Sequence, residues 1–347
     1  MLSAEGSTRL GCCSTKKPFS LRCNVWFNRV LVQLLRVSVV VACYNEERDI
    51  GVCLTDLLAQ DYEDFEIVIV DGGSTDRTVQ LVEAFMEKSS KISLFFEDER
   101  RGPGNARNIG TKVSSGEVLI FRDADSKTPD KRFIRNLVEP FEDPDVQAVL
   151  ASSYALIPTT SFLEASLMLS HYGHRLRGCG SLPEAYRKVL FLGVGGFDSE
   201  LGFGEDVDLA TRVLARRVKL AYTKDPVLVG AEVRSLSELV RRELWYGSTI
   251  LNFLKKRPKA LVRVVYAILH PLILFGVVLS LLWSPLLPIS LFGFLILLAY
   301  PFWKVALSIR NTGRVVESLF IPALQLFQSL VLSVGLVSGL VRAAFRL

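Results

Sequence analysis

The sequence predicts an α/β chain in which a doubly wound sheet is followed by helices apolar enough for a membrane. Through the first half, short runs of β-branched residues alternate with amphipathic segments, and polar residues directly follow several of these runs. Hydrophobic residues make up 50% of the 347 residues, and beyond Lys259 they gather into long stretches with few charges. Such stretches are typical of membrane segments.

Residues 1–36 are expected to form an extension to which we assign no function. They lack the long apolar core and the small-residue cleavage site of a secretory signal. Arg22, Arg29 and Arg36 interrupt the apolar positions of this region. No uncharged run there is therefore long enough to span a bilayer.

Four apolar runs predict the strands of the sheet. They are VSVVVA (37–42), EIVIVD (66–71), ISLFF (92–96) and EVLIF (117–121). Continuous apolar runs suit strands that are buried on both faces. The helical segments between them predict parallel strands joined by crossovers.

Polar residues at the strand ends predict a ligand site. Ligands of doubly wound sheets bind beyond the carboxyl ends of the strands. The residues that follow three of the predicted strands are acids and an amide: Asn45, Glu46, Glu47, Asp71, Asp123 and Asp125. Because these strand ends meet at one edge of a parallel sheet, we expect the side chains to surround one site.

Two of these strand ends differ in how much local structure explains them. In VDGGSTDRT (70–78), capping of the following helix accounts for Ser74 to Asp76 but leaves Asp71 unexplained. In FRDADS (121–126), Asp123 and Asp125 are one residue apart at a strand end, where both carboxylates can face one site. Hard divalent cations prefer such oxygen ligands and leave room for phosphate oxygens.

The chain after Pro129 is expected to add a helix, a strand near 146–156 and a helix at 161–177. The glycine-rich turn GVGGFDSELGFGED (193–206) then leads into a helix that starts near Glu205. Residues 235–256 form an amphipathic segment with Leu, Trp, Tyr and basic side chains. It is expected to rest on lipid headgroups, with an ordinary surface helix as the alternative.

Three apolar stretches each approach the ~20 residues that cross a bilayer. They are residues 261–283, 285–303 and 319–341. Basic residues before the first stretch, and Lys304 and Arg310 after the second, place both of those ends in the cytoplasm by the positive-inside rule. If the third stretch also spanned the membrane, Arg342 and Arg346 would lie outside the cytoplasm, against the same rule. Two to three spans are therefore expected, and with two spans the third stretch would be re-entrant.

Charge and cysteine content exclude several classes of protein. The net charge is +5, and the basic residues form no stripe interleaved with aromatics, so a nucleic-acid partner is not expected. The 6 cysteines include no C-x-x-C pair and no zinc spacing. Reduced thiols in a cytosolic compartment are therefore expected.

Four blocks of the sequence together carry a resemblance to a known family. They are VSVVVACYNEERDI, VDGGSTDRT, GPGNARNIGTKVSSGEVLIFRDADS and GGFDSELGFGEDVDLATRV. In this order and at these spacings they resemble family 2 glycosyltransferases with the GT-A fold. The resemblance covers about residues 36–225. It implies a doubly wound mixed sheet that binds a nucleotide-diphosphate sugar as donor.

The resemblance also implies the roles of the donor-binding residues. By position, Asp71 binds the nucleobase and Asp123 lies near the ribose. Asp125 would hold Mg²⁺ or Mn²⁺ against the diphosphate. Asn45 and Glu47 belong to the block that lines the nucleotide pocket. Arg107 matches a basic position near the donor, and the resemblance leaves open whether it contacts phosphate or packs a helix.

The run GEDVDLATRV matches the family's E-D motif, which makes Asp206 the catalytic base and places Glu205 on the acceptor side. A sugar hydroxyl is a poor nucleophile, and a carboxylate within reach can accept its proton as the new bond forms. With one base and no evident covalent nucleophile, an inverting displacement is expected. Both acids would also be stabilised at a helix N-terminus, which is the structural alternative.

The family's processive polymerases carry Q-x-x-R-W after the base, whereas this chain has RRELW (241–245). A processive synthase is therefore less expected. Arg241, Arg242 and Trp245 are assigned to the membrane side of the acceptor site.

The sequence thus divides into an extension (1–36), a catalytic domain (37–233), an interfacial segment (234–260) and a membrane region (261–347). The expected activity is hexosyl transfer to a hydroxyl of a glycolipid or lipid-linked oligosaccharide, with the catalytic domain on the cytoplasmic side of a cell membrane. A polyprenyl-phosphate acceptor and an inactive membrane scaffold are the alternatives.

Overall fold

The computed structural model describes residues 35–172, 182–225, 227–229, 233, 235–258 and 287–345. Nearly all of the expected extension at 1–36 and the whole first apolar stretch at 261–283 lie outside these residues, as does the end of the helix expected at 161–177.

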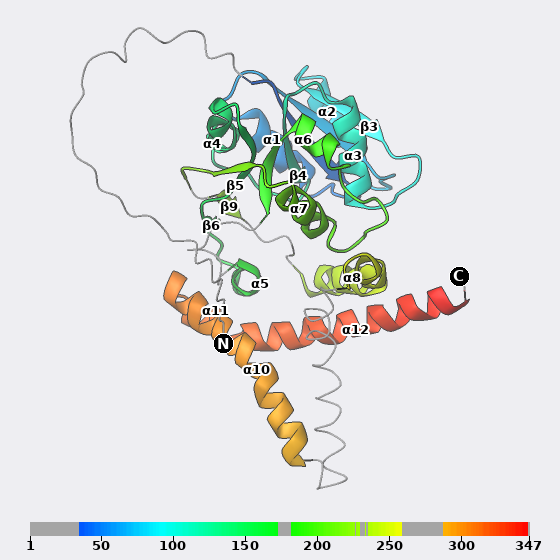
Figure 1. The fold of residues 1–347 in the computed structure, drawn as a ribbon, viewed down its shortest axis with the longest axis vertical. Coiled ribbons are helices and arrows are strands. Elements are labelled where there is room, and N and C mark those ends of the chain that lie inside the picture. The colour runs from blue at the N-terminus through cyan, green and yellow to red at the C-terminus, as the bar shows by residue number, and fades with distance from the viewer. Residues whose placement is uncertain are drawn as a thin grey trace, which may run out of the picture. The chain divides into compact units, whose positions relative to one another are not determined.

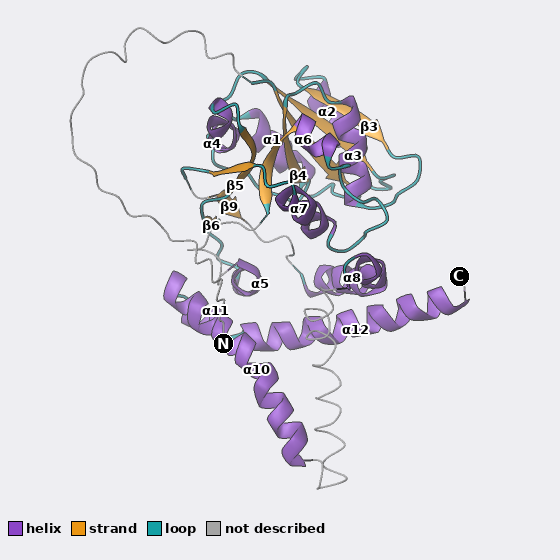
Figure 2. Ribbon diagram, in the orientation of Figure 1, coloured by secondary structure: helices purple, strands orange, loops and turns teal. Residues whose placement is uncertain are grey.

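A seven-stranded mixed sheet forms the centre of the region expected to be the catalytic domain (Figure 2). Its order is β3-β2-β1-β4-β7-β5-β8. The strands are β1 (Val37–Cys43), β2 (Phe65–Asp71), β3 (Ile92–Phe96), β4 (Val118–Asp123), β5 (Val146–Leu150), β7 (Pro183–Arg187) and β8 (Lys219–Tyr222). Only β7 runs antiparallel to its neighbours β4 and β5. A second pair joins β6 (Tyr154–Leu156) to β9 (Val227–Val229).

The first four strands confirm the apolar runs, and their register brings the polar ends together. In β1, Cys43 pairs with Asp71 of β2, and Ala42 pairs with Asp123 of β4. The carboxyl ends of these three strands therefore share one edge of the sheet.

Helices cover both faces of the sheet (Figure 1). They are α1 (Ile50–Leu58), α2 (Thr78–Met86), α3 (Pro103–Val113), α4 (Phe133–Val138), α6 (Lys188–Gly193) and α7 (Glu205–Ala215), with a 3₁₀ turn η1 (Glu139–Glu142). Helix α5 (Phe162–Tyr172) instead packs against the C-terminal helices. Alternate residues of β1 face opposite layers: Val39 packs in the cluster with α1 and α4, and Val40 packs in the cluster with Ala106 of α3. This alternation follows from the period of two in a strand.

The C-terminal part of the structure is helical. It contains α8 (Leu236–Lys256), α10 (Leu287–Thr312), α11 (Val315–Leu319) and α12 (Ile321–Phe345). Among the described residues, one stretch, Val315–Phe345, is long and apolar enough to cross a membrane by length and composition alone. Helix α10 covers the second apolar stretch, whose spanning role stays a prediction.

Helix α8 confirms the amphipathic helix expected at 235–256, and protein covers its apolar side. Ser235 caps its first turn by accepting a hydrogen bond from the Glu238 amide at 3.2 Å. Leu239 packs with Leu167 of α5 and Leu324 of α12. Direct contact of α8 with lipid headgroups therefore stays a prediction, because α12 occupies much of that side.

Candidate active site

A cleft of about 300 Å³ opens at the carboxyl edge of the sheet. The ends of β1 and β4, the loop before α3, and helices α3, α7 and α8 all contribute to it. Seven of the residues singled out from the sequence line this one cleft: Glu46, Arg107, Asp123, Asp125, Glu205, Arg242 and Trp245. Elements far apart along the chain thus place acids, a guanidinium and an aromatic ring around one space.

Arg107 joins the two acidic motifs. It lies on α3 with a side chain that is 10% exposed, and it donates to Asp123 at 2.5 Å and to Glu205 at 3.2 Å. Burial alone lowers the pKa of a guanidinium, but these two carboxylates outweigh it, and the pKa of Arg107 is raised. Its guanidinium also lies 5.2 Å from the centre of the Phe197 ring. The sequence left open whether Arg107 contacts phosphate or packs a helix, and in the structure it pairs with these two carboxylates.

Asp123 and Asp125 leave β4 at the cleft, and their oxygens suit a hard divalent cation. The Asp123 side chain is 51% exposed although one oxygen accepts from Arg107. Within the described residues, no group of three or more His, Cys, Asp or Glu side chains is placed to hold a metal. Two carboxylates at a strand end are a donor set that fits Mg²⁺ or Mn²⁺ completed by phosphate and water oxygens.

The two acids of the E-D motif open helix α7 and differ in their surroundings. Gly204 has a φ of 75° before the helix, so the chain enters it from a left-handed turn. The Glu205 side chain is 12% exposed, and burial raises its pKa to about 7 against the opposing effect of Arg107. Asp206 is exposed and accepts from the Val207 amide at 2.7 Å. Only Glu205 lines the cleft itself.

Asp71 lies beneath the cleft. Residues of its own turn donate hydrogen bonds to both of its carboxylate oxygens. The residue is 1% exposed. One oxygen accepts from the amides of Gly73 and Ser74 at 2.9 and 2.7 Å, and the other accepts from the Ser74 hydroxyl at 2.5 Å. Local structure therefore explains Asp71, contrary to our expectation from the sequence. Its contact with a nucleobase stays a prediction.

Asn45 and Glu47 fix a neighbouring turn and do not line the cleft. Asn45 has a φ of 57°, and its side-chain oxygen accepts from the Thr75 amide at 2.7 Å. Glu47 accepts from the amide and the side chain of Arg77, both at 3.2 Å. These contacts tie the turn after β1 to the turn after β2, and the donor-binding role of both residues stays a prediction.

Two residues that line the cleft have no role assigned from the sequence: Glu46, which was expected at the site from its place after the first strand, and Tyr44, which the sequence did not indicate. Glu46 stands between Asn45 and Glu47 in the sequence. Its burial raises its pKa, and nearby acids, of which Asp49 has the largest effect, act in the same direction, so that the pKa is about 7. Tyr44 also lines it, with the Arg100 guanidinium 3.5 Å from its ring centre. In the NEE triplet, the left-handed turn at Asn45 decides which side chain faces the cleft, and the letters alone do not reveal it.

Helix α8 forms one wall of the cleft. Trp245 and Arg242 line it, whereas Arg241 is exposed and lies outside it. A Cβ added at Gly102 would lie 3.6 Å from the Trp245 ring, so the loop before α3 approaches the indole closely. The acceptor-side assignment of these residues stays a prediction, supported by position for two of the three.

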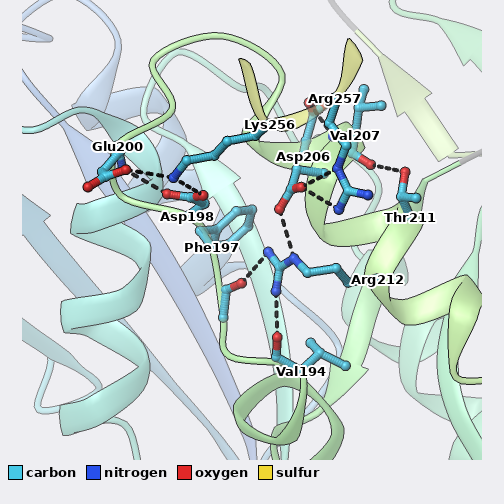
Figure 3. Close-up of polar contacts among 12 residues, drawn as sticks. Val194, Phe197, Asp198, Glu200, Asp206, Val207, Thr211, Arg212, Lys256 and Arg257 are labelled. Atoms are coloured by element: carbon cyan, nitrogen blue, oxygen red, sulfur yellow. Dashed lines mark hydrogen bonds and ion pairs between the residues drawn. The ribbon is translucent and has the colours of Figure 1, made fainter. Parts of the chain in front are cut away.

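The end of α8 is bound to the segment that carries the E-D motif (Figure 3). Lys256 donates to Asp198 at 2.5 Å and to Glu200 at 2.7 Å. The next residue, Arg257, donates to Asp208 of α7 at 2.7 Å, and Asp208 also accepts from Arg212 at 2.7 Å. The Asp208 side chain is only 6% exposed, so the residue after α8 is tied to α7 through a buried carboxylate.

Comparisons with known proteins agree with this architecture. Residues 38–183 match the family described as Glycosyl transferase family 2. Glycosyltransferase AglE of Haloferax volcanii is 33% identical over 222 residues, which are 61% of this chain and 71% of that protein. Glycosyltransferase GlyG of Streptococcus pneumoniae is 30% identical over 118 residues, 34% of this chain.

The chain spans only part of several relatives that it matches. It covers 39% of GlyG and 36% of an uncharacterized glycosyltransferase of Haemophilus influenzae. Among solved structures, the mannosyltransferase PcManGT from Pyrobaculum calidifontis, in complex with GDP-Man and Mn²⁺, matches with a TM-score of 0.56 at 23% identity. That match covers 89% of this chain and 88% of that chain, and it shows a shared fold.

The order of the strands, the acids at the sheet edge and the extent of the match to AglE lead to one assignment. The chain belongs to glycosyl transferase family 2 and has the GT-A fold.

Proposed function

We propose that the protein is an inverting, metal-dependent glycosyltransferase that moves a sugar from a nucleotide diphosphate to a hydroxyl of a membrane-associated acceptor. One observation supports it most strongly. Asp123 at the end of β4, Asp125 just after it and Glu205 of α7 line the same cleft, and Arg107 links Asp123 to Glu205 across it. A donor diphosphate and an acceptor hydroxyl would both be within reach of such a site.

The donor half of the proposal rests on the end of β4. Asp125, with Asp123 beside it, would hold Mg²⁺ or Mn²⁺, as expected for a cation that also binds substrate phosphates. Such an ion stabilises negative charge on a departing diphosphate as a Lewis acid. Arg107 pairs with one oxygen of Asp123 at the cleft.

The acceptor half rests on the start of α7. Asp206 accepts the proton of the acceptor hydroxyl while that oxygen bonds to the anomeric carbon and the nucleotide diphosphate leaves. A single displacement of this kind inverts the anomeric centre. Glu205 is less suited to be the base, because it is paired with the buried Arg107. Asp206 stands beside it with an exposed side chain.

The membrane part of the proposal rests on the C-terminal helices. Helix α8 lines the cleft, and α12, which packs on α8, is part of the stretch Val315–Phe345 that is apolar enough for a membrane. We place the catalytic domain on the cytoplasmic side of a cell membrane, with a multi-pass anchor and a glycolipid or lipid-linked oligosaccharide as acceptor.

The test uses membranes that contain the protein, a panel of labelled nucleotide sugars, and extraction of the lipids with and without a chelator. One labelled lipid product that disappears on chelation is expected. Asp206→Asn should lower its formation by ~10²-fold or more, since it removes the base. Asp145→Asn, at an exposed site outside the cleft, should leave it unchanged.

The same experiment separates the alternatives. A polyprenyl-phosphate acceptor is already a nucleophile and needs no base, so full activity of Asp206→Asn would favour that acceptor. Absence of transfer and of nucleotide diphosphate release with every donor would favour an inactive scaffold.

A further inference from the structure

Helices α8 and α12 touch through their backbones at three glycines. A Cβ added at Gly247 of α8 would lie 2.1 Å from a carbonyl oxygen of α12. Added at Gly335 or Gly339 of α12, it would lie 2.4 or 2.6 Å from a carbonyl oxygen of α8. No side chain larger than hydrogen fits at these points, so the two helices are packed as closely as helices can be.

The first half of α12 is held as well. Leu324 packs with Leu167 of α5 and with Leu239 of α8. Further along, Gln328 donates to the buried Glu243 of α8 at 3.3 Å. With the glycine contacts, α12 stays against α5 and α8 from Ile321 to Gly339. At 1.5 Å per residue this is about 27 Å of helix.

Helix α8 is bound to the catalytic domain. Trp245 lines the cleft, and Lys256 and Arg257 bind the segment around α7 (Figure 3). A helix that follows such a partner for about 27 Å cannot use the same residues to cross a hydrocarbon core of about 30 Å, because crossing would carry it away from the domain.

The opposite side of α12 is an aliphatic stripe. Leu330, Val334, Val337 and Val341 are 37%, 62%, 59% and 46% exposed. Their spacing of four, three and four residues puts them on one face of the helix. Val315, Val316 and Leu319 of α11 are also exposed, immediately before α12.

Lipid is the occupant that the chain itself indicates for this stripe. The two apolar stretches at 261–283 and 285–303 precede α11 and α12, and each has the length that crosses a bilayer. A membrane anchored by them would lie next to the start of α12. An amphipathic helix beside a membrane buries its apolar face at the boundary of headgroups and acyl chains.

We infer that α12 lies in the plane of the membrane surface, with its glycine face on α8 and its aliphatic stripe in lipid. The inference rests on the membrane association of the proposed function. It leaves the C-terminus on the same side as the catalytic domain. Arg342 and Arg346 then lie on the cytoplasmic side, which removes the conflict that a third span creates with the positive-inside rule.

The test measures depth along α12 in the full chain reconstituted into phospholipid vesicles. Single cysteines at Leu330, Val334 and Val341 carry a fluorophore, which is quenched by nitroxides placed either shallow or deep on the lipid chains. Native Cys12, Cys13, Cys23 and Cys179 are replaced by Ser. Cys43 and Cys53 stay, because both are buried and burial raises the pKa of each thiol, which slows labelling.

An in-plane helix gives the same preference for the shallow quencher at all three positions. A spanning helix places Val334 near the bilayer centre and Val341 about 10 Å closer to the surface, so deep quenching concentrated at Val334 would overturn the inference. Asp145→Cys, labelled on the catalytic domain, provides the unquenched control.

Two further readouts keep the possible failures distinct. A protease site added after Leu347 should be cut from the side of sealed vesicles that also exposes the catalytic domain, and cutting only from the other side would overturn the inference. Protein that does not sediment with vesicles at all would remove the membrane part of the proposed function together with it. Protein that binds vesicles but shows a depth gradient would remove this inference alone.

Discussion

Arg107 is the residue on which the charge balance of the cleft depends. Asp123 and Glu205 come from segments far apart in the sequence, and both turn their oxygens to this one guanidinium. Its side chain is only 10% exposed, so removing it would leave Glu205 buried without its partner cation. An uncompensated buried charge is far more costly than a lost surface pair.

We therefore expect Arg107→Met to lower the free energy of unfolding by about 3–5 kcal/mol. The matched control is Arg101→Met, which removes an ion pair with Glu99. The side chains of Arg101 and Glu99 are 58% and 74% exposed. That change should cost less than about 1 kcal/mol. Denaturant unfolding of both variants measures the difference, and equal effects would show that the Arg107 pairs contribute no more than surface charges.

Glu46 should make stability depend on pH. Its pKa of about 7 lies above the ordinary value of 4.5, so between these pH values the folded protein binds more protons than the unfolded chain. Stability therefore falls as pH rises through this window. Because the group is partly exposed, the effect should be on the order of 1 kcal/mol.

Glu46→Gln should accordingly raise the melting temperature at pH 8 and leave it unchanged at pH 4. Thermal unfolding in detergent at both pH values is the measurement. An equal change in melting temperature at both pH values would show that the substitution acts through packing and not through titration of Glu46.

At this scale the sequence identified the acids but not their partners. Asp123, Asp125 and Glu205 were predicted at the site and line the cleft. Asn45 and Glu47 instead fix a turn through Thr75 and Arg77. Which side chain of a polar cluster faces the ligand depends on the local backbone, and residue type alone does not determine it.

At the scale of the elements, helix α3 depends on a close approach to the sheet. A Cβ added at Gly110 would lie 2.4 Å from a methyl of Val40 and 3.2 Å from a methyl of Val70. Both methyls belong to the buried strands β1 and β2, so they cannot move aside. The helix carries Arg107, and its distance from the sheet therefore also sets the position of that guanidinium.

Gly110→Ala is expected to destabilise the protein, since overpacking costs about 1–3 kcal/mol and outweighs the gain in helix propensity of about 1 kcal/mol. Gly193→Ala is the control, because a Cβ there meets nothing within 4 Å. It should be neutral or slightly stabilising. Chemical denaturation compares the two, and a stabilised Gly110→Ala would show that α3 can shift freely.

The junction of α7 and α8 is the second element-level prediction. Arg257→Gln removes the charged donor from Asp208 and leaves Arg212 as the remaining cation there. We expect a loss of about 2 kcal/mol, as for a hydrogen bond to a charged group. The neighbouring Lys255→Gln, at an exposed position, should have little effect. Similar losses in both would contradict a specific role for Arg257.

Strand β7 is, with β8 and β9, one of the strands that the sequence did not reveal. Its five residues, PEAYR, show neither a long apolar run nor a clear alternation. It becomes a strand because β4 and β5 offer free edges on both of its sides. Periodicity detects elements that are specified locally, such as β1, and misses those that exist only through distant partners.

At the scale of the whole molecule, ligand binding should report the integrity of the cleft. A nucleoside diphosphate with Mn²⁺, at 100 times its dissociation constant, should add about 2.7 kcal/mol to the stability of a chain that binds it only when folded. Asp125→Asn should abolish the part of this gain that requires the metal. A thermal shift assay with and without chelator measures it, and a gain that ignores the metal would contradict the cation site.

The placement of β7 between β4 and β5 also has a consequence for the newborn chain. During synthesis β4 emerges well before β7, and until then its outer side is an unprotected edge made of Val118, Leu119 and Ile120. Bare apolar edges of this kind invite pairing with other chains. We therefore expect the chain to be more prone to aggregation before residues 183–187 have been made, because their pairing with β4 covers this edge.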